Sequence, residues 1–102
     1  MILPSSIMIK VSSIEKAEPY FLVCRFNNKA VKKLDILALI ENHKNLQGIE
    51  QLLESQIFKK VRIGEMGQIV WDNIITTNYN GEQMIWDYDI SPEFAFENAE
   101  PL

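Results

Sequence analysis

The alternation of hydrophobic and polar residues predicts three strands in the first third of the chain. Residues 7–14 alternate weakly, as a half-buried strand does. Residues 20–26 are rich in aromatic and β-branched side chains, and residues 30–34 return from them after the segment Asn27-Asn28-Lys29. Asparagine tolerates the positive φ angles of tight hairpin turns. We therefore expect these strands to pair in an antiparallel meander.

Helical periodicity replaces this alternation at Asp35, a residue type that caps the N-terminus of a helix. Ile36, Leu39 and Ile40 then fall at positions i, i+3 and i+4, which form one apolar face of a short helix. The other elements predicted in the middle of the chain are a short helix over residues 49–57, a strand over residues 58–63 and a glycine-containing turn at residues 64–67.

The most clearly specified element is a long β-hairpin that turns at Asn80-Gly81, a dipeptide that favours the type I′ turn. Because side chains alternate along a strand, the turn fixes which residues share a face. The predicted pairs on one face are Tyr79–Glu82, Thr77–Met84, Ile75–Trp86, Asn73–Tyr88 and Trp71–Ile90. The predicted pairs on the other face are Asn78–Gln83, Thr76–Ile85, Ile74–Asp87 and Asp72–Asp89.

The chain closes with a predicted helix that starts at Ser91-Pro92-Glu93 and runs to about Asn98, with Phe94 and Ala95 directed at the sheet. Residues 98–102 are expected to form a flexible tail. The whole pattern predicts an α+β fold, with one antiparallel meander sheet of about five to six strands and two or three short helices. The length of 102 residues predicts a single domain over residues 1–102.

The charges of the chain are divided unevenly along the sequence, although the net charge is only −4. All ten lysines and arginines lie within residues 10–62, where six acids leave a net charge of +4. Residues 63–102, here called the acidic segment, hold eight acids and no base. Such an asymmetry arises by chance in some small acidic proteins, but it also bears on partners. A −8 segment attracts a basic protein and repels nucleic acid.

The compartment is expected to be the cytoplasm. Cys24 is the only cysteine, so the chain forms no internal disulfide, as is usual in a reducing compartment. The first residues lack the pattern of a signal peptide, and no stretch approaches the roughly 20 apolar residues needed to cross a bilayer. We therefore expect no membrane association.

No set of residues in the sequence indicates catalysis or metal binding. His43, the only histidine, lies at a predicted helix end, where a solvated structural role is expected. Cys24 lies in an apolar strand and is interpreted as a small buried hydrophobic residue. Asp87-Tyr88-Asp89 resembles the start of a calcium loop, but Pro92 replaces the glycine that such a loop needs. We therefore expect no enzyme activity and no cofactor.

The order of these elements resembles a bacterial family, the domain of unknown function 2442. The matching segments are residues 21–26, Asn27-Asn28, Leu34-Asp35-Ile36, Phe58 with Val61, residues 67–71 and residues 89–93. Together they cover roughly residues 7–94. Two features depart from the family pattern: Lys29 stands where the family usually has glycine, and residues 74–87 read as an insertion that lengthens the hairpin.

The resemblance implies an α+β domain with no established activity. Members of that family are similar to small proteins encoded beside another small protein in a toxin–antitoxin-like arrangement, and others are joined to a helix-turn-helix. This chain is too short to hold such a second domain beside the first, so we do not expect sequence-specific DNA binding.

The sequence thus leaves several functions open. The first is a non-enzymatic domain that binds a protein, for example as an antitoxin-like or regulatory partner of a basic protein. Aromatic side chains in the long hairpin are core residues in the simpler interpretation, but tryptophan and tyrosine are also frequent in binding surfaces. The candidate partner-binding residues, beside which Phe94 also lies, are Trp71, Tyr79, Trp86, Asp87, Tyr88 and Asp89.

The remaining hypotheses concern other partners. A homodimer is a variant of the first, because the positive and negative parts of two copies attract one another. Nucleic-acid binding is the alternative from another class, and it requires the two hairpins to bring the basic residues to one face. Those residues are Lys29, Lys32, Lys33, Lys59, Lys60 and Arg62. An enzyme ranks third.

Overall fold

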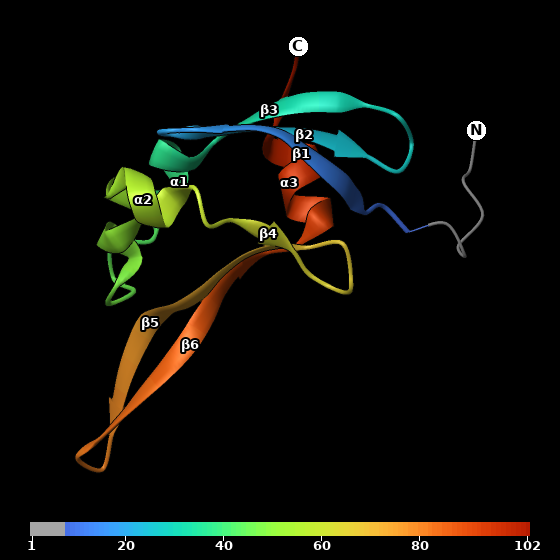
Figure 1. Ribbon diagram of the computed structural model, residues 1–102. Helices are drawn as coiled ribbons and strands as arrows, with labels where there is room; N and C mark the ends of the chain where they lie inside the picture. Colours follow the sequence, from blue (N-terminus) through green and yellow to red (C-terminus); the bar gives the residue numbers. More distant parts are fainter. Residues whose placement is uncertain (1–7) are drawn as a thin grey trace.

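The structure, a computed structural model that describes residues 8–102, has an α+β fold with two antiparallel sheets (Figure 1). The first sheet contains, in spatial order, β1 (Val11–Glu18), β2 (Phe21–Phe26), β3 (Val31–Asp35) and β7 (Glu100–Pro101). The second contains β4 (Arg62–Ile63), β5 (Ile69–Tyr79) and β6 (Glu82–Ile90). The α+β class and the antiparallel pairing are confirmed, but the strands are divided between two sheets instead of forming one.

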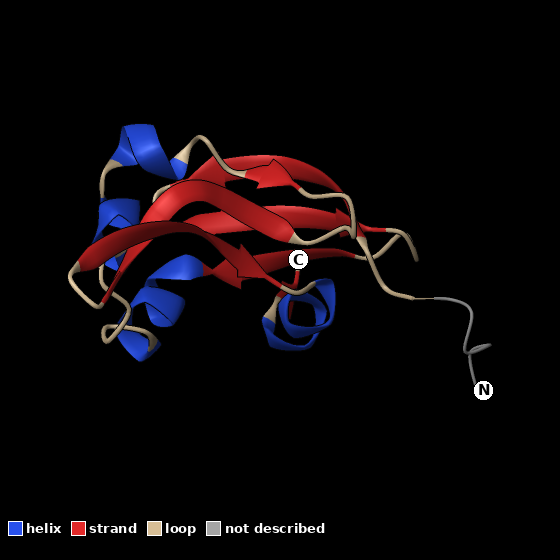
Figure 2. Cartoon of the chain, turned by 90° about the horizontal axis from the view of Figure 1, so that it is seen from below, coloured by secondary structure: helices blue, strands red, loops and turns tan. Residues whose placement is uncertain are grey.

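In the described part of the chain, three short α-helices and one 3₁₀ helix connect and cover the strands. They are α1 (Ile36–Asn42), the 3₁₀ helix η1 (Ile49–Leu53), α2 (Ser55–Phe58) and α3 (Pro92–Asn98). In Figure 2, α3 lies apart from the other helical segments, which gather at one end of the strands. Figure 2 also shows that α3 lies to one side of the strands, and it contacts β3.

Three predicted boundaries need correction. The first strand begins at Val11, and the start predicted at residue 7 lies outside the described residues. Phe58 ends α2 and does not begin a strand. The carbonyl groups in the last turn of a helix have no partner within the helix, and the Phe58 carbonyl accepts a hydrogen bond from the Trp71 indole at 2.9 Å. The expected tail is ordered at Glu100 and Pro101, which pair with β3.

The helix caps form as the sequence predicts. The Asp35 carboxylate accepts a hydrogen bond from the Ala38 N–H group at 3.2 Å, and the apolar face of α1 is buried. The Ser91 hydroxyl accepts one from the Phe94 N–H group at 3.1 Å at the start of α3. This helix buries Ala95 and leaves Phe94 exposed, so the prediction that Phe94 packs on the sheet is wrong.

The core lies between the sheets and the helical segments, and Trp71 is its largest fully buried side chain. The Trp71 ring packs against Phe58 and stacks on Tyr88, with ring centroids 5.8 and 6.1 Å apart. Trp71 and Tyr88 are therefore core residues: Trp71 is 1% exposed, and Tyr88 is 7% exposed and reaches the surface only as a lining residue of a hollow. A buried tryptophan usually finds a partner for its N–H group, and the Phe58 carbonyl is that partner here.

The long hairpin has the predicted turn and, over its outer half, the predicted register. Asn80 and Gly81 have φ angles of 50° and 81°, as a type I′ turn requires. The pairs from Tyr79–Glu82 to Ile75–Trp86 are confirmed. Below them the prediction is wrong by two residues on β5: Trp71 pairs with Tyr88, and Ile69 pairs with Ile90.

The shift comes from a bulge in β5 between Trp71 and Ile75. Asn73 adopts a φ angle of 56°, in the left-handed region that asparagine tolerates better than most residues. The bulge adds two residues to β5 and increases the local bend, as bulges generally do. Beyond it the hairpin extends away from the rest of the molecule (Figure 1), whose longest dimension is 51 Å.

Candidate functional site

The outer part of the long hairpin, residues 76–87, is the most exposed apolar element of the fold; we call it the β arm. None of its side chains is buried, although the residues that flank it, Ile75 and Tyr88, both are. Four large apolar side chains of the β arm are exposed, with exposed fractions of 44 to 71%: Tyr79, Met84, Ile85 and Trp86. Contiguous exposed apolar groups often mark an interaction site.

The register gives the β arm two different faces. Tyr79, Met84 and Trp86 belong to cross-strand pairs that share one side, which we call the Trp86 face. The Trp86 indole N–H group donates to the Thr77 hydroxyl at 2.8 Å, which holds the ring across the strands. The opposite face contains Ile85 among polar neighbours, since Thr76 lies opposite it and Gln83 precedes it on the same side.

The Trp86 face leads into a hollow at the base of the β arm. Ile75, the cross-strand partner of Trp86, is one of its lining residues. The hollow has a volume of about 490 Å³, and its other lining residues come from the end of α1, from β6 and from the start of α3: His43, Leu46, Asp87, Tyr88, Asp89, Ile90, Ser91 and Phe94. Apolar and aromatic walls with a few polar groups are typical of binding sites.

His43 and Tyr88 provide the direct polar contact inside this hollow. The His43 Nδ1 atom lies 2.9 Å from the Tyr88 hydroxyl, and the rings meet edge to face. Burial, with a smaller contribution from Asp89, raises the pKa of Tyr88 to about 12. The Tyr88 hydroxyl therefore stays protonated at neutral pH. His43 caps α1, as its position predicts, but it pairs with Tyr88 and is only partly solvated.

The base of the β arm is anchored on the loop that precedes η1. The Thr76 N–H group donates to the Gln47 carbonyl and the Gln51 side chain donates to the Ile74 carbonyl, both at 2.9 Å. Gly48 lets the two backbones approach, because a Cβ atom there would lie 1.8 Å from the Ile74 oxygen. These contacts fix the direction in which the β arm leaves the body.

The predicted site residues fall into two groups, since Trp71 and Tyr88 are buried and the other four are exposed. Tyr79 and Trp86 lie exposed on the β arm, and Asp89 is exposed at its base. Asp87 has a structural contact, because its carboxylate accepts a hydrogen bond from the Asn73 N–H group at 2.9 Å and so supports the bulge. The sequence reasoning missed Met84 and Ile85 as site residues. The alternation showed which face each of the two residues shares, but not that this part of the hairpin lies beyond the core.

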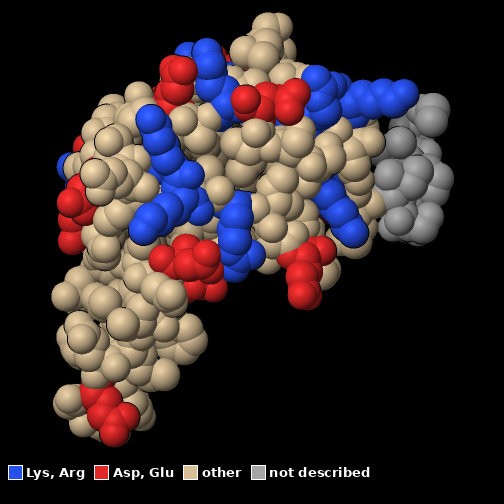
Figure 3. Space-filling view, viewed as in Figure 1, with Lys and Arg blue, Asp and Glu red and all other residues tan. Residues whose placement is uncertain are grey.

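Charge is distributed unevenly over this surface. The β arm has no basic side chain, and Figure 3 shows a mostly uncharged surface there, with acidic atoms at the tip. Within residues 8–102, Asp72 is the only member of the acidic segment in an ion pair. Its bond to Arg62 at 2.8 Å lowers the pKa of the Asp72 carboxyl. The other acids of the segment are available to a basic partner.

The basic residues do not assemble into one patch. Lys32 and Lys33 are adjacent in β3, so their side chains leave opposite faces of the sheet. Lys32 donates to the Phe96 carbonyl at 2.8 Å and lies over the Phe96 ring, while Lys33 lies over the Phe21 ring. Arg62 is paired with Asp72. Lys32 and Lys33 therefore do not share a face, whereas Lys29, Lys59 and Lys60 are exposed.

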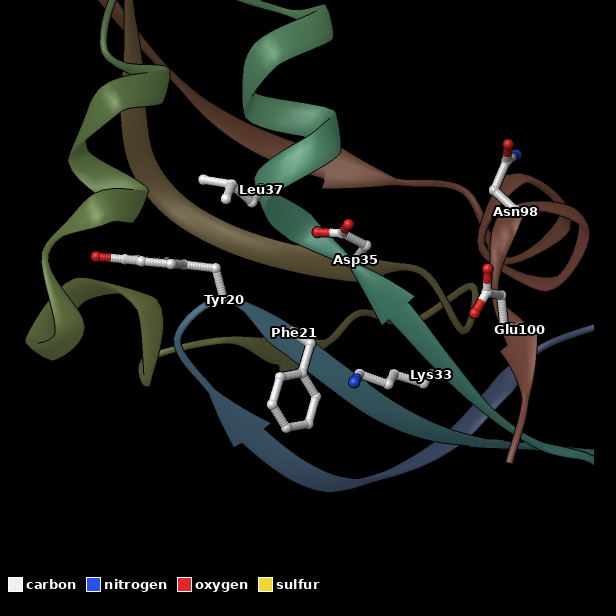
Figure 4. Close-up of a pocket in the computed structure, with 7 residues that line it drawn as sticks. All are labelled: Tyr20, Phe21, Lys33, Asp35, Leu37, Asn98 and Glu100. Atoms are coloured by element: carbon white, nitrogen blue, oxygen red, sulfur yellow. The ribbon is translucent and has the colours of Figure 1, made fainter.

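A second hollow, of about 320 Å³, lies beside β3 and α1 (Figure 4). Its lining residues are Tyr20, Phe21, Lys33, Asp35, Leu37, Asn98 and Glu100. Two of its charged groups already serve the fold: Asp35 caps α1, and Lys33 lies over the Phe21 ring. The hollow under the β arm is larger and adjoins the exposed Trp86 face, so it is the better candidate site for a partner.

The described residues show neither a cluster of metal ligands nor a helix that could span a membrane. The part of the chain that the structure describes contains no group of three or more His, Cys, Asp or Glu side chains placed to hold a metal. Among residues 8–102, no helix is long and apolar enough to cross a membrane.

The raised pKa values of two buried groups, the Cys24 thiol and the Tyr88 hydroxyl, predict a loss of stability at high pH. Burial raises the pKa of the Cys24 thiol from 9.0 to about 11, and that of Tyr88 from 10.0 to about 12. Folding thus favours both neutral forms, so this stabilisation is complete below pH 9 and is lost as pH rises through the folded-state values. We expect the free energy of unfolding to fall by about 3 kcal/mol between pH 8 and pH 11.

Urea unfolding at a series of pH values measures this fall. The variant Cys24→Ala removes one of the two groups and should show a clearly smaller fall over the same range. Equal falls in the two proteins would contradict the assignment to Cys24.

Comparison with protein-family models, with curated proteins and with solved structures finds no match to this chain. The functional argument therefore rests on the β arm and on the chemistry around it.

Proposed function

We propose that this chain is a non-enzymatic protein-binding domain, with the β arm as its contact surface and a basic protein as its partner. The observation that carries the proposal is the exposure of Trp86 beside Met84 and Tyr79 on one face of an element that projects from the body. Large aromatic residues dominate the binding energy of many protein interfaces.

Two further features support a basic partner. The β arm and the rest of the acidic segment contain no lysine or arginine, so a positively charged surface meets no like charge there. Complementary charge of this kind mainly speeds association and selects the partner. The resemblance described above adds a context, since an antitoxin-like role against a basic protein is one form such binding takes.

The hollow at the base of the β arm adds a place for an anchoring side chain. Its walls include Ile75 and Phe94, and its polar pair, His43 and Tyr88, lies part-buried among them. Binding hot spots typically fill such partly desolvated pockets, while neighbouring contacts exclude water. We expect a partner that contacts Trp86 to place an apolar side chain in this hollow.

Co-purification from the cells that naturally produce the chain tests the proposal. We expect a basic protein to elute with the tagged chain at low salt and to be lost as the salt concentration rises, because screening weakens the attraction. The double variant Tyr79→Ser, Trp86→Ser, which changes two exposed residues of the Trp86 face, should reduce recovery of that protein at least tenfold.

The matched control is Leu37→Ser, which removes an apolar side chain of similar exposure, 43%, from a different surface. It should recover as much of the basic protein as the unchanged chain does. Recovery of no protein at low salt, or equal losses in both variants, would contradict the proposal.

A further inference from the structure

The outer edge of β6 is an unpaired strand edge. Among residues 8–102, β6 is the last strand of its sheet and pairs only with β5. A two-residue type I′ turn makes its flanking residues a hydrogen-bonded pair, so the peptide groups of Gln83, Ile85 and Asp87 turn away from β5. Thr76, which lies opposite Ile85, confirms this alternation, because its N–H group points outward to the Gln47 carbonyl.

The middle of this edge, between Glu82 and Asp87, lacks the usual protection against pairing. Sheet edges are normally blunted by lysine, proline, bulges or a covering segment. The centre of the edge is Met84-Ile85-Trp86, which is uncharged and apolar. Gln47 and Gln51 cover part of the outer edge of β5, but no contact within residues 8–102 covers the peptide groups of Gln83 and Ile85. Figure 1 shows no other element alongside the outer half of β6.

We propose that this edge pairs with β6 of a second copy of the chain, antiparallel, about a two-fold axis at Ile85. The two hairpins would then form a continuous four-stranded sheet. A two-fold axis at Ile85 makes this residue a hydrogen-bonded pair with its own copy, and it pairs Gln83 with Asp87 of the second copy. All three positions have outward peptide groups, so the hydrogen-bond pattern of both strands is satisfied.

The same register is complementary in its side chains. Met84 lies opposite Trp86 of the second copy, and Ile85 lies opposite Ile85, so the exposed apolar residues of β6 meet one another. Each Asp87 lies opposite the uncharged Gln83. The two Asp87 carboxylates stand four residues apart along the strands, roughly 13 Å, where salt screens their repulsion.

Pairing would also stabilise the β arm. A two-stranded ribbon alone in water is marginally stable, and three or more strands with an apolar face are usually needed. The antiparallel arrangement places the two bodies at opposite ends of the new sheet. The Trp86 face remains exposed in the dimer, and the Met84 and Trp86 side chains of the second copy extend it. The dimer can therefore still bind the basic protein through this face.

Register-specific cross-linking tests the dimer. In Ile85→Cys the two introduced thiols face each other across a hydrogen-bonded pair, whose Cα separation of about 5.5 Å suits a disulfide. Oxidised glutathione should therefore link this variant into a dimer. In the control Gln83→Cys the thiols stand about 13 Å apart or more and should remain unlinked. Cys24 is buried and does not interfere.

Light scattering at a series of concentrations provides a second, non-covalent measurement. Gln83→Lys places a positive charge opposite each Asp87 and should tighten the dimer about 2- to 30-fold, whereas Gln83→Asp should weaken it to a similar extent. A chain that stays monomeric throughout, or equal linking of both cysteine variants, would overturn the dimer. A monomer that still recovers the basic protein through Trp86 would leave the proposed function standing.

Discussion

Trp71→Ala is expected to lower the free energy of unfolding by about 3–5 kcal/mol. The substitution removes the largest buried side chain, which packs on Phe58 and stacks on Tyr88. It also removes the 2.9 Å hydrogen bond that the buried Phe58 carbonyl accepts from the indole N–H group, and leaves that carbonyl only the longer bond from the Val61 N–H group at 3.4 Å. Urea unfolding followed by circular dichroism measures the loss.

Trp86→Ala is the matched control, since it removes the same side chain from the β arm. Trp86 is 49% exposed and loses one surface hydrogen bond to Thr77, so we expect a cost of about 1 kcal/mol or less. Equal losses from the two variants would contradict the division of the tryptophans between core and β arm.

Gly48→Ala is expected to cost about 2–4 kcal/mol. Gly48 has a φ angle of 104°, where a side chain is strained, and an added Cβ atom would lie 1.8 Å from the Ile74 oxygen. The backbones of the loop and of β5 would have to separate. This would weaken the hydrogen bonds of Gln47 and Gln51 that anchor the β arm.

Gly81→Ala separates the effect of the close contact from that of the φ angle. Gly81 also has a positive φ angle, 81°, but no heavy atom lies within 4 Å of an added Cβ atom there. We expect a cost of about 1 kcal/mol, which reflects the backbone conformation alone. Thermal unfolding of the two variants measures the difference. A Gly81 variant as unstable as the Gly48 variant would contradict the role assigned to the loop contact.

Local signals in the sequence were sufficient where short-range chemistry decides the structure. Asn80-Gly81 fixed the turn and the outer register, and Asp35 and Ser91 fixed two helix starts. These features depend on a few neighbouring residues, such as a capping oxygen or a residue that tolerates positive φ.

Features that depend on tertiary contacts were not predictable in this way. The bulge at Asn73 is supported by Asp87 on the opposite strand and by the loop at Gly48, which is distant in sequence. The only local indication of an irregular strand was the pair Asp72-Asn73, because both residue types are depleted in strands. The short pairing of β7 with β3 likewise depends on where α3 places the chain end.

The candidate site was only half predictable. Alternation placed Trp86 and Met84 on one face, but it could not show that the body ends at Ile75 and Tyr88 and leaves that face exposed. The same reasoning grouped Trp71 and Tyr88 with Trp86, although the first two lie in the core. Burial depends on which element covers a face, and the pattern along one hairpin does not contain that information.

Site-specific photo-cross-linking tests most directly the central claim that the β arm docks a basic protein. Trp86 is replaced by p-benzoylphenylalanine in the cells that naturally produce the chain, and Leu37, exposed on another surface, receives the same group as a control. We predict an adduct with a basic protein from position 86 and none from position 37. No such adduct from position 86, or equal adducts from both positions, would contradict the claim.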